Sequence, residues 1–436
     1  MSAGDLGRGI GEGDIDPVAL VGGYLEAIRN HGFSDRIYAR LTEETALAQA
    51  KAAAMRAKNG TRFSLVDGVP VSWKDLFDTA GVATEAGSAL LKGRVPEHNA
   101  EVVDNGQGMG LVGLGKTHMS ELAFSGLGLN PVTASPPCVN DHAAVSGGSS
   151  SGAAASVAFG LAAAGIGSDT GGSVRLPAAW NDLVGLKTTS GRLSLEGVVP
   201  LVASFDTVGP LCRNVEDAAL MLAALEGRAR PADLEGANLR GARFLILANG
   251  LRDVRQTPRA GFDHAVGRMM DAGAGVERGS LDIIDEALAM SAMLFTSEAY
   301  AIWREVIEAH PGRMYAPILE RFRAGGRFSA VDCIAAWKRL QEIRREFQSL
   351  VAGYDAVILP TAASRPPDAS RLMHDHDYYV TENLLALRNT RIGNLMGSAA
   401  LTLPTGVAST GIMFLGAPFG EEKLLRIGSA VEAALA

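Results

Sequence analysis

The chain of 436 residues contains only three cysteines, Cys138, Cys212 and Cys333. They form no CxxC pair and no disulfide framework, which is typical of a protein kept in a reducing compartment. The chain also has no excess of basic residues, because it contains 48 Asp and Glu but only 40 Lys and Arg, and it has no run of basic residues. Nucleic acid is therefore not an expected partner.

Long apolar runs are also missing. The longest, residues 153–167, is broken by Ser156 and consists mainly of Ala and Gly. A membrane span requires about 20 apolar residues, usually rich in Leu, Ile and Val. The N-terminal segment is polar and Gly-rich, unlike a signal peptide. These absences predict a soluble, cytoplasmic protein with no membrane partner.

Glycine, in contrast, is abundant, with 52 residues, and seven of them gather in two patches at residues 147–152 and 165–172. Glycine collects where the backbone adopts positive φ or approaches another group closely. The two patches therefore mark the region in which a functional site is most expected.

Expected strands and helices alternate along the whole chain. Asp16-Pro17 is typical of a helix start, and a second helix is expected from about residue 43 to the Asn59-Gly60 stop. A further helix is expected over residues 153–164. Strands are expected at residues 111–114, 166–167, 243–248, 354–360 and 400–404. This order predicts an α/β protein with a largely parallel or mixed sheet, and the lack of repeats and linkers favours one domain.

Three segments carry candidate chemistry. Residues 147–152 (GGSSSG) place serines at the mouth of an expected helix, where free N–H groups suit a developing negative charge. Residues 167–175 (GSDTGGSVR) offer consecutive N–H groups beside a hydroxyl, and no Lys follows the glycines as a phosphate loop would require. Lys74 lies in a half-buried strand pattern, where an unpaired lysine is rare; the ordinary alternative is pairing with Asp75.

The spacing of these segments resembles the amidase signature family. Ser149 follows Lys74 by 75 residues and Ser173 follows Ser149 by 24. The family's Gly/Ser signature maps onto residues 147–175, and its lysine motif maps onto residues 70–75 (PVSWKD). Further similarity lies in residues 115–123 (GKTHMSELA), 180–188 (WNDLVGLKT), 191–192 and 206–210 (DTVGP). The likeness is dense over residues 66–217, weaker at 353–361 and 393–435, and nearly absent from about 228 to 340.

This resemblance implies one amidase signature domain over residues 1–436. Its fold would be a central mixed, mostly parallel sheet covered by helices on both faces. The signature core would span about residues 66–217, a variable middle region about 228–350, and C-terminal core strands and a helix about 353–436. The substrate pocket would be built from the variable middle region and from loops outside the signature.

The resemblance also implies a triad of Lys74, Ser149 and Ser173, with a cis peptide bond next to Ser149. Neutral Lys74 would take a proton from Ser149, which would take one from the nucleophile Ser173. Burial would therefore have to lower the pKa of Lys74 from about 10.4 toward neutrality. Backbone N–H groups of Thr170, Gly171 and Gly172, with that of Ser173, would form the oxyanion hole. No metal and no cofactor are expected.

Some nearby residues have two interpretations. Asp169 and Arg175 are expected to hold the signature loop through hydrogen bonds rather than to contact substrate. Ser150 either supports the oxyanion site or caps a helix. Arg388 and Arg391 either line the pocket or pair with acidic groups at the surface.

The sequence also departs from the family pattern. His118 stands where the family usually has Asn, so contact with substrate would differ there, and Ala399 stands where many relatives have Pro. Residues 105–110 (NGQGMG) carry glycines where relatives have Leu and Ala. Because Gly costs up to about 1 kcal/mol in a helix interior, a helix there is expected to be marginal.

Two further patterns are interpreted as coincidental. Residues 148–152 also satisfy GxSxG, the nucleophile elbow of α/β-hydrolases, which needs a strand directly before it. Residues 140–146 (NDHAAVS) are poor strand material, which disfavours the elbow. His374-Asp375-His376-Asp377 invites a metal site, but a single HxH in a polar loop is usually solvated surface.

We therefore expect an amidohydrolase that cleaves a carbon–nitrogen amide bond, with carbamates or esters as further substrates because the acyl chemistry is shared. Its partner would be a small-molecule amide or carbamate, and the chain would be a monomer or homodimer. The alternative is the amidase (A-type) subunit of a glutamine-dependent tRNA amidotransferase, which works with a partner chain. A non-catalytic binding module on the same fold is the third hypothesis.

Overall fold

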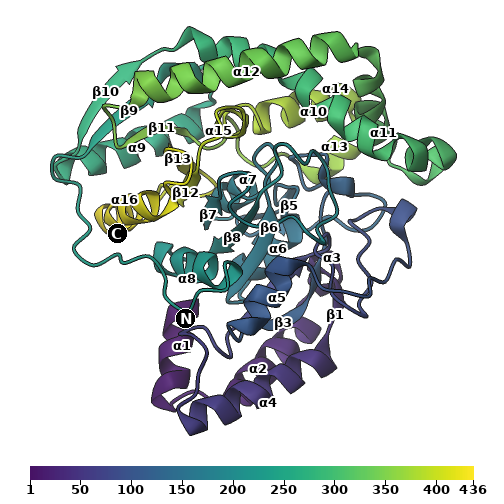
Figure 1. Cartoon of the computed structure of the whole chain (residues 1–436), viewed down its shortest axis with the longest axis vertical. Helices are drawn as coiled ribbons and strands as arrows, with labels where there is room; N and C mark the ends of the chain where they lie inside the picture. The colour runs from purple at the N-terminus through teal and green to yellow at the C-terminus, as the bar shows by residue number, and fades with distance from the viewer.

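The computed structural model describes residues 1–436 and is built on one sheet of 11 strands (Figure 1). The strands are β1 (Tyr38–Leu41), β2 (Pro70–Lys74), β3 (Val112–Thr117), β6 (Ala164–Ser168), β7 (Val184–Lys187), β8 (Val208–Cys212), β9 (Arg243–Leu247), β10 (Gly275–Gly279), β11 (Ala356–Pro360), β12 (Ala400–Pro404) and β13 (Gly411–Leu415). Their order in the sheet is β1-β3-β2-β6-β8-β7-β12-β13-β11-β9-β10. A separate two-stranded sheet pairs β4 (Pro137–Cys138) with β5 (Asp141–Val145).

The sheet is mixed, as predicted, but it is not mostly parallel. Parallel pairs occur in two places only, within β3-β2-β6 on one side and β11-β9-β10 on the other. The strands between them, from β6 to β11, all pair antiparallel, and so do β1 and β3. The alternation of strands and helices did not predict these antiparallel pairs. β12 and β13 are joined by a short turn, pair antiparallel with each other, and lie between β7 and β11.

Sixteen α-helices surround the sheet. They are α1 (Ala3–Glu12), α2 (Pro17–Asn30), α3 (Ser34–Ile37), α4 (Glu43–Asn59), α5 (Glu101–Gly108), α6 (Ser151–Ala158), α7 (Arg175–Trp180), α8 (Val215–Leu225), α9 (Gln256–Asp271), α10 (Asp282–Ala309), α11 (Ala316–Arg323), α12 (Ala330–Val351), α13 (Ala369–His374), α14 (His376–Ala386), α15 (Thr390–Leu395) and α16 (Glu421–Leu435). The 3-10 helices are η1 (Ala89–Leu91), η2 (Glu121–Ala123), η3 (Ala248–Leu251), η4 (Pro311–Arg313) and η5 (Ala324–Arg327).

The helix ends follow local capping chemistry. The Asp16 side chain accepts hydrogen bonds from the Val18 and Ala19 amides, and Pro17 takes the first helical position, as predicted. Helix α4 stops at Gly60, which adopts a left-handed conformation with φ 68°. Helix α6 is shorter than predicted because Gly160, with φ 76°, turns the chain before β6.

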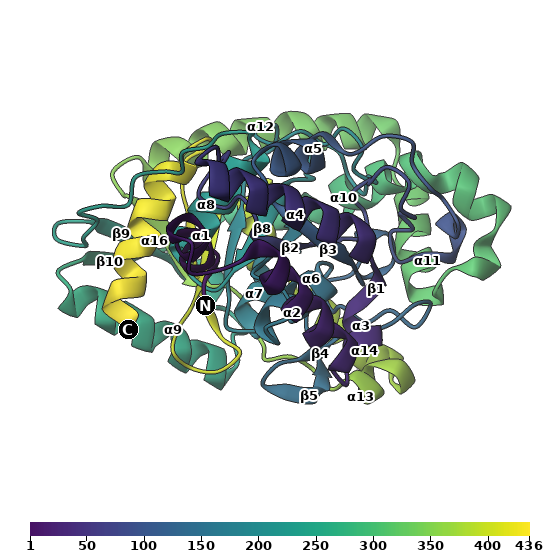
Figure 2. The same cartoon turned by 90° about the horizontal axis from the view of Figure 1, so that it is seen from below.

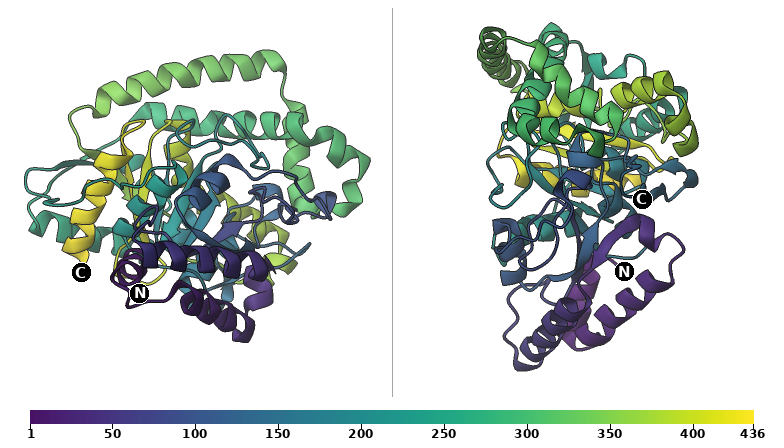
Figure 3. Two further views of the ribbon diagram at one scale, coloured as in Figure 1. Left: turned by 60° about the horizontal axis from the view of Figure 1, so that its bottom comes forward. Right: turned by 90° about the vertical axis from the view of Figure 1, so that its right-hand side faces the viewer.

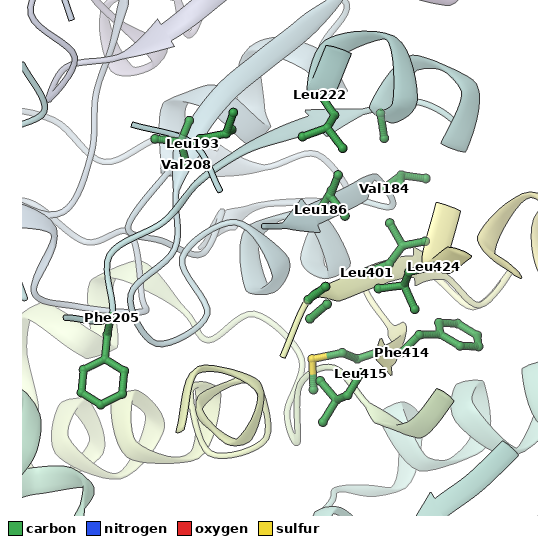
Figure 4. Packing of buried hydrophobic residues seen from close by; sticks show 14 of the residues in the cluster. Val184, Leu186, Leu193, Phe205, Val208, Leu222, Leu401, Phe414, Leu415 and Leu424 are labelled. Carbon is green, nitrogen blue, oxygen red and sulfur yellow. The ribbon is translucent and has the colours of Figure 1, made fainter. Parts of the chain in front are cut away.

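Helices cover both faces of the sheet, which confirms that prediction. On one face α6 and α7 pack through small residues, with Ala153, Ala154 and Ala178 around Leu211 of β8. On the other face Leu222 of α8 and Leu424 of α16 lie beside strands β7, β12 and β13 (Figure 4). The N-terminal helices α2 and α4 lie together at one end of the molecule, and the long helices α10 and α12 lie at the other (Figures 1 and 3). Seen from below, α2 and α4 therefore lie in front of the sheet (Figure 2).

One local expectation is corrected by the structure and another stays a prediction. Residues 101–108 form helix α5, in which Gly106 is buried beside Leu111 and Trp73, and the marginal stability of this helix stays a prediction. Residues 141–145 do form a strand, β5. That strand belongs to the separate two-stranded sheet, and Ser146 and Gly147 intervene before the serines. The strand–turn–helix of a nucleophile elbow on the central sheet is therefore absent.

Candidate active site

Lys74 and Ser168 lie side by side because two parallel strands end together. Trp73 of β2 is in register with Ile166 of β6, and Lys74 and Ser168 are the last residues of these strands. The Lys74 Nζ atom donates a hydrogen bond to Ser168 Oγ at 2.8 Å. The site thus begins at the carboxyl edge of the parallel part of the sheet, where ligands bind in many α/β proteins.

Ser149 approaches the same lysine from the loop before α6. The Gly148–Ser149 peptide bond is cis, and Lys74 Nζ donates to Ser149 Oγ at 2.7 Å. The loop packs closely against the backbone at Gly128, and position 148 has no space for a side chain, because a Cβ on Gly148 would lie 2.7 Å from the Gly128 nitrogen. Both Lys74 and Ser149 are completely buried.

Burial controls the charge of Lys74. It lowers the pKa of this ammonium from 10.5 to about 7, while the carboxylates of Asp206 and Asp169 act in the opposite direction. A large fraction of the lysine is therefore neutral near pH 7. A neutral amine within hydrogen-bond distance of a hydroxyl can act as a general base.

Ser173 lies in the loop between β6 and α7, and Asp169 holds that loop. The Asp169 carboxylate accepts hydrogen bonds from the Gly172 and Val174 amides and pairs with the Arg175 guanidinium at 2.9 Å. Burial by itself would raise the pKa of Asp169, but the charge and hydrogen bonds of Arg175 outweigh it and lower that pKa. Asn394 completes the network through hydrogen bonds to both side chains. The predicted structural role of Asp169 and Arg175 is confirmed.

The same network corrects the expectation for Gly172. Its N–H donates to the Asp169 carboxylate at 2.9 Å and is therefore not free to bind an oxyanion. Gly172 instead provides backbone conformation, since its φ is 136° and a Cβ would lie 2.1 Å from Thr390 Oγ1. The amides of Thr170, Gly171 and Ser173 have no acceptor within the chain. These three remain the candidate oxyanion donors.

Ser173, Thr170 and Gly171 line a cavity of about 420 Å³. Its other walls come from η2 and the following residues, from α10, α11 and η5, and from α14 and α15; they include Phe124, Ser125, Leu201, Ser291, Phe295, Arg321, Tyr379, Asn383, Leu387 and Arg391. The variable middle region, through α10, α11 and η5, thus contributes to this cavity, and its role as the substrate pocket stays a prediction. The volume suits a small molecule rather than a long chain.

No hydrogen bond joins the hydroxyls of Ser149 and Ser173 in this structure. The two residues are connected through their neighbours, because the Ser150 amide donates to the Ser173 carbonyl at 3.2 Å. Lys74 and Ser149 are thus in contact, and Ser173 stands next to them on the side of the cavity.

Comparison with known proteins agrees with this geometry. The family model described as Amidase matches residues 19–425. The chain belongs to the amidase signature family. It is a hydrolase of the kind that acts on carbon–nitrogen bonds.

Three relatives define its neighbourhood in that family. It is 34% identical to 2-amino-5-chloromuconic acid deaminase of Comamonas testosteroni, over 91% of this chain and 88% of that one. It is 33% identical to the A-type subunit of the glutamyl-tRNA(Gln) amidotransferase of Anaeromyxobacter dehalogenans (strain 2CP-C), over 98% and 95%. A solved structure described as an amidase has a TM-score of 0.89, 29% identity and complete coverage of both chains.

The remaining predicted residues of this amidase-family chain take distinct places. Ser150 neither lines the cavity nor caps α6 with its side chain; its hydroxyl bonds to the backbone of Ser168. His118 does not line the cavity either, and its carbonyl accepts from the Gly152 amide. Arg388 pairs with Asp253 at 3.0 Å, whereas Arg391 lines the cavity.

The sequence analysis missed two residues of the site. Ser168 had a usable signal, because it directly follows a predicted strand that runs parallel to the strand of Lys74. Arg321 had none, since nothing in the local pattern of α11 distinguishes it from an exposed arginine.

No group of three or more His, Cys, Asp or Glu side chains is arranged to hold a metal ion. This includes the His and Asp side chains of residues 374–377. None of the helices combines the length and the apolar character that a membrane crossing requires.

Proposed function

We propose that this amidase-family hydrolase cleaves a linear amide through a seryl acyl-enzyme formed on Ser173, with Lys74 as base and Ser149 as proton relay. The contact between buried Lys74 and Ser149, at 2.7 Å and beside the cavity that Ser173 lines, is the observation that supports it most. The lowered pKa of Lys74, about 7, suits a base that works near neutral pH.

In the proposed reaction Lys74 accepts the proton of Ser149, and Ser149 accepts the proton of Ser173. The Ser173 oxygen forms a bond to the carbonyl carbon, and the carbonyl oxygen becomes an oxyanion bound by the free amides of Thr170, Gly171 and Ser173. The carbon–nitrogen bond then breaks, and Ser149 returns a proton to the leaving nitrogen. Water hydrolyses the acyl ester by the same route. The hydrogen bond between Ser149 and Ser173 forms when substrate closes the site, as catalytic hydrogen bonds commonly do.

Amides are the proposed substrates, and carbamates and esters follow because they present the same carbonyl to Ser173. The chain is proposed to act as a monomer or homodimer, without metal or cofactor, in the cytoplasm.

A second candidate is the amidase chain of a glutamine-dependent tRNA amidotransferase. The identity to such a chain, 33% over 98% of this one, favours it. The two candidates differ in what the isolated protein can do. Release of ammonia from simple amides by the purified chain supports the stand-alone hydrolase, and activity that requires an added partner chain supports the amidotransferase.

A serine-directed fluorophosphonate tests the nucleophile. We expect covalent labelling at Ser173, located by peptide mass spectrometry, and loss of both labelling and turnover in Ser173→Ala. Ser125→Ala is the matched control, because Ser125 lines the same cavity without contacting Lys74. In this variant Ser173 should still be labelled. Labelling at Ser150, or full activity of Ser173→Ala, would replace the proposal with a different nucleophile.

A further inference from the structure

Two arginines from distant parts of the chain line the same cavity as Ser173. Arg321 lies on α11 in the variable middle region, and Arg391 lies on α15 in the C-terminal region. They lie close enough for the charge of Arg321 to lower the pKa of Arg391. The fold therefore places two positive groups in the wall of one cavity.

Neither guanidinium has an acidic partner. Arg321 donates to the Phe124 carbonyl at 3.1 Å and stacks over the Phe124 ring at 4.4 Å. The side chain of Arg391 has one contact with a polar group, a long hydrogen bond to Ser291 Oγ at 3.4 Å. The buried Arg175, in contrast, is fully engaged by Asp169, Asn394 and a backbone carbonyl group. Most N–H groups of Arg321 and Arg391 are thus unpaired.

Both arginines keep their charge at neutral pH. Burial lowers the pKa of each, that of Arg391 to about 10, which is still well above 7. Two like charges in a half-buried cavity are unfavourable unless an anion offsets them. The chain itself provides only Glu320, which is exposed at the cavity, and Arg327 and His376 at the rim add no negative charge.

The rest of the wall is apolar or neutral. Phe124, Phe295 and Leu387 provide hydrophobic surface, and Tyr379 and Asn383 provide uncharged polar groups. A planar guanidinium matches the two oxygens of a carboxylate, so two of them form a strong site for one. The cavity therefore has the features of a receptor for a small molecule with an apolar body and an anionic end.

We propose that the acyl part of the substrate carries a free carboxylate, held by Arg321 and Arg391 while its amide carbonyl lies at Ser173. This inference rests on the proposed function and names its substrate class: monoamides of small dicarboxylic acids. Arg321 and Arg391 are then specificity-determining residues.

The kinetic test compares acids with neutral analogues of the same shape. Ammonia release is measured for succinamate against succinamide, and for 4-carbamoylbenzoate against terephthalamide. Wild type should prefer the acid by about 100-fold in kcat/KM, and Arg391→Gln or Arg321→Gln should reduce this preference to about tenfold or less, mainly through KM. Arg391→Lys keeps the charge without the planar fork and should be intermediate. Arg388→Gln is the control, since Arg388 pairs with Asp253, and its preference should stay at the wild-type level.

A binding test separates this inference from the proposed reaction. Succinate, terephthalate and inorganic phosphate are titrated calorimetrically into Ser173→Ala alone and into Ser173→Ala combined with each arginine variant. We expect dicarboxylate binding that weakens about tenfold or more in the Arg321 and Arg391 variants but not in Arg388→Gln.

Each outcome supports or overturns a separate part of this model. Equal turnover of acids and neutral diamides, no measurable binding of either dicarboxylate, or tighter binding of phosphate would overturn the inference. Arginine-dependent binding of dicarboxylates without ammonia release or fluorophosphonate labelling in the wild type would support the carboxylate site and reject the proposed reaction instead.

Discussion

Lys74 illustrates how a single residue couples stability and chemistry. Burial of the ammonium is unfavourable, and the carboxylates of Asp206 and Asp169 offset this only in part, so the pKa of Lys74 falls to about 7. The same desolvation that costs stability produces a neutral amine near physiological pH. Lys74 therefore gains its proposed role from where the strand ends rather than from its type alone.

Lys74→Arg is the sharpest test of that role. We expect kcat/KM to fall about 100- to 10,000-fold, as much as in Lys74→Ala, because a guanidinium keeps its proton at all working pH values. The wild-type pH profile should have an acid limb near the pKa of Lys74, about 7. Ser149→Ala and the double variant should be similarly low, because residues of one relay are not additive. An active Lys74→Arg enzyme would show that Lys74 is not the base.

At the scale of elements, the loop between β6 and α7 carries the proposed nucleophile Ser173, and a network of hydrogen bonds fixes its backbone. Asp169 binds the Gly172 and Val174 amides, Arg175 joins it to Asn394 on α15, and the Thr390 hydroxyl donates to the Gly171 carbonyl. The direction in which the remaining amides point is set by this scaffold. Small shifts of α15 would therefore be transmitted to the oxyanion donors.

Neighbouring glycines in this loop should respond in opposite ways. In Gly172→Ala the added methyl would clash with Thr390 at a φ of 136°, so we expect a loss of kcat of about 100-fold or more, as when an oxyanion donor is displaced. In Gly171→Ala a Cβ meets nothing within 4 Å, and both stability and the loop amides should be retained. Steady-state kinetics gives kcat for the two variants, and urea unfolding gives their stability. Equal kcat in the two variants would mean that loop conformation does not control turnover.

At the scale of the molecule, three buried lysines link folding to pH. Burial lowers the pKa of Lys74 and Lys187 to about 7 and that of Lys116 to about 8. Above these values the folded state releases protons that the unfolded chain retains up to about pH 10.4. The unfolded state then binds more protons, so the free energy of unfolding contributed by each lysine rises with pH.

Lys74→Met isolates one of these contributions. Between pH 7.5 and 8.5 the wild type should gain about 1 kcal/mol in free energy of unfolding relative to Lys74→Met, because the variant has no proton to release. Equilibrium urea unfolding of both proteins at the two pH values gives this difference. Parallel pH dependence of the two proteins would mean that Lys74 has an ordinary pKa in the folded state.

The cavity is likewise a property of the whole molecule. Ser173 comes from the signature core, Arg321 from the variable middle region and Arg391 from the C-terminal region. The resemblance to the family, dense in the core and nearly absent over 228–340, predicted the catalytic residues and left the residues that line the cavity unspecified. That wall is where substrate class is proposed to be decided.

The sequence by itself determined what depends on neighbours along the chain. The capping of α2 by Asp16, the stop at Gly60, the α/β class and the motif residues Lys74, Ser149 and Ser173 follow from short patterns and their spacing. Such signals are local because a cap or a turn is satisfied within a few residues.

Only the tertiary structure decided which strands pair antiparallel, that Asp169 engages the Gly172 amide, and that Arg321 and Arg391 line the same cavity. Each depends on contacts between residues far apart in the chain, where burial and packing override local preference. An arginine's sequence context does not reveal whether a carboxylate will lie beside it. In this fold neither Arg321 nor Arg391 forms an ion pair with a carboxylate of the chain, so both can bind the carboxylate of the proposed substrate.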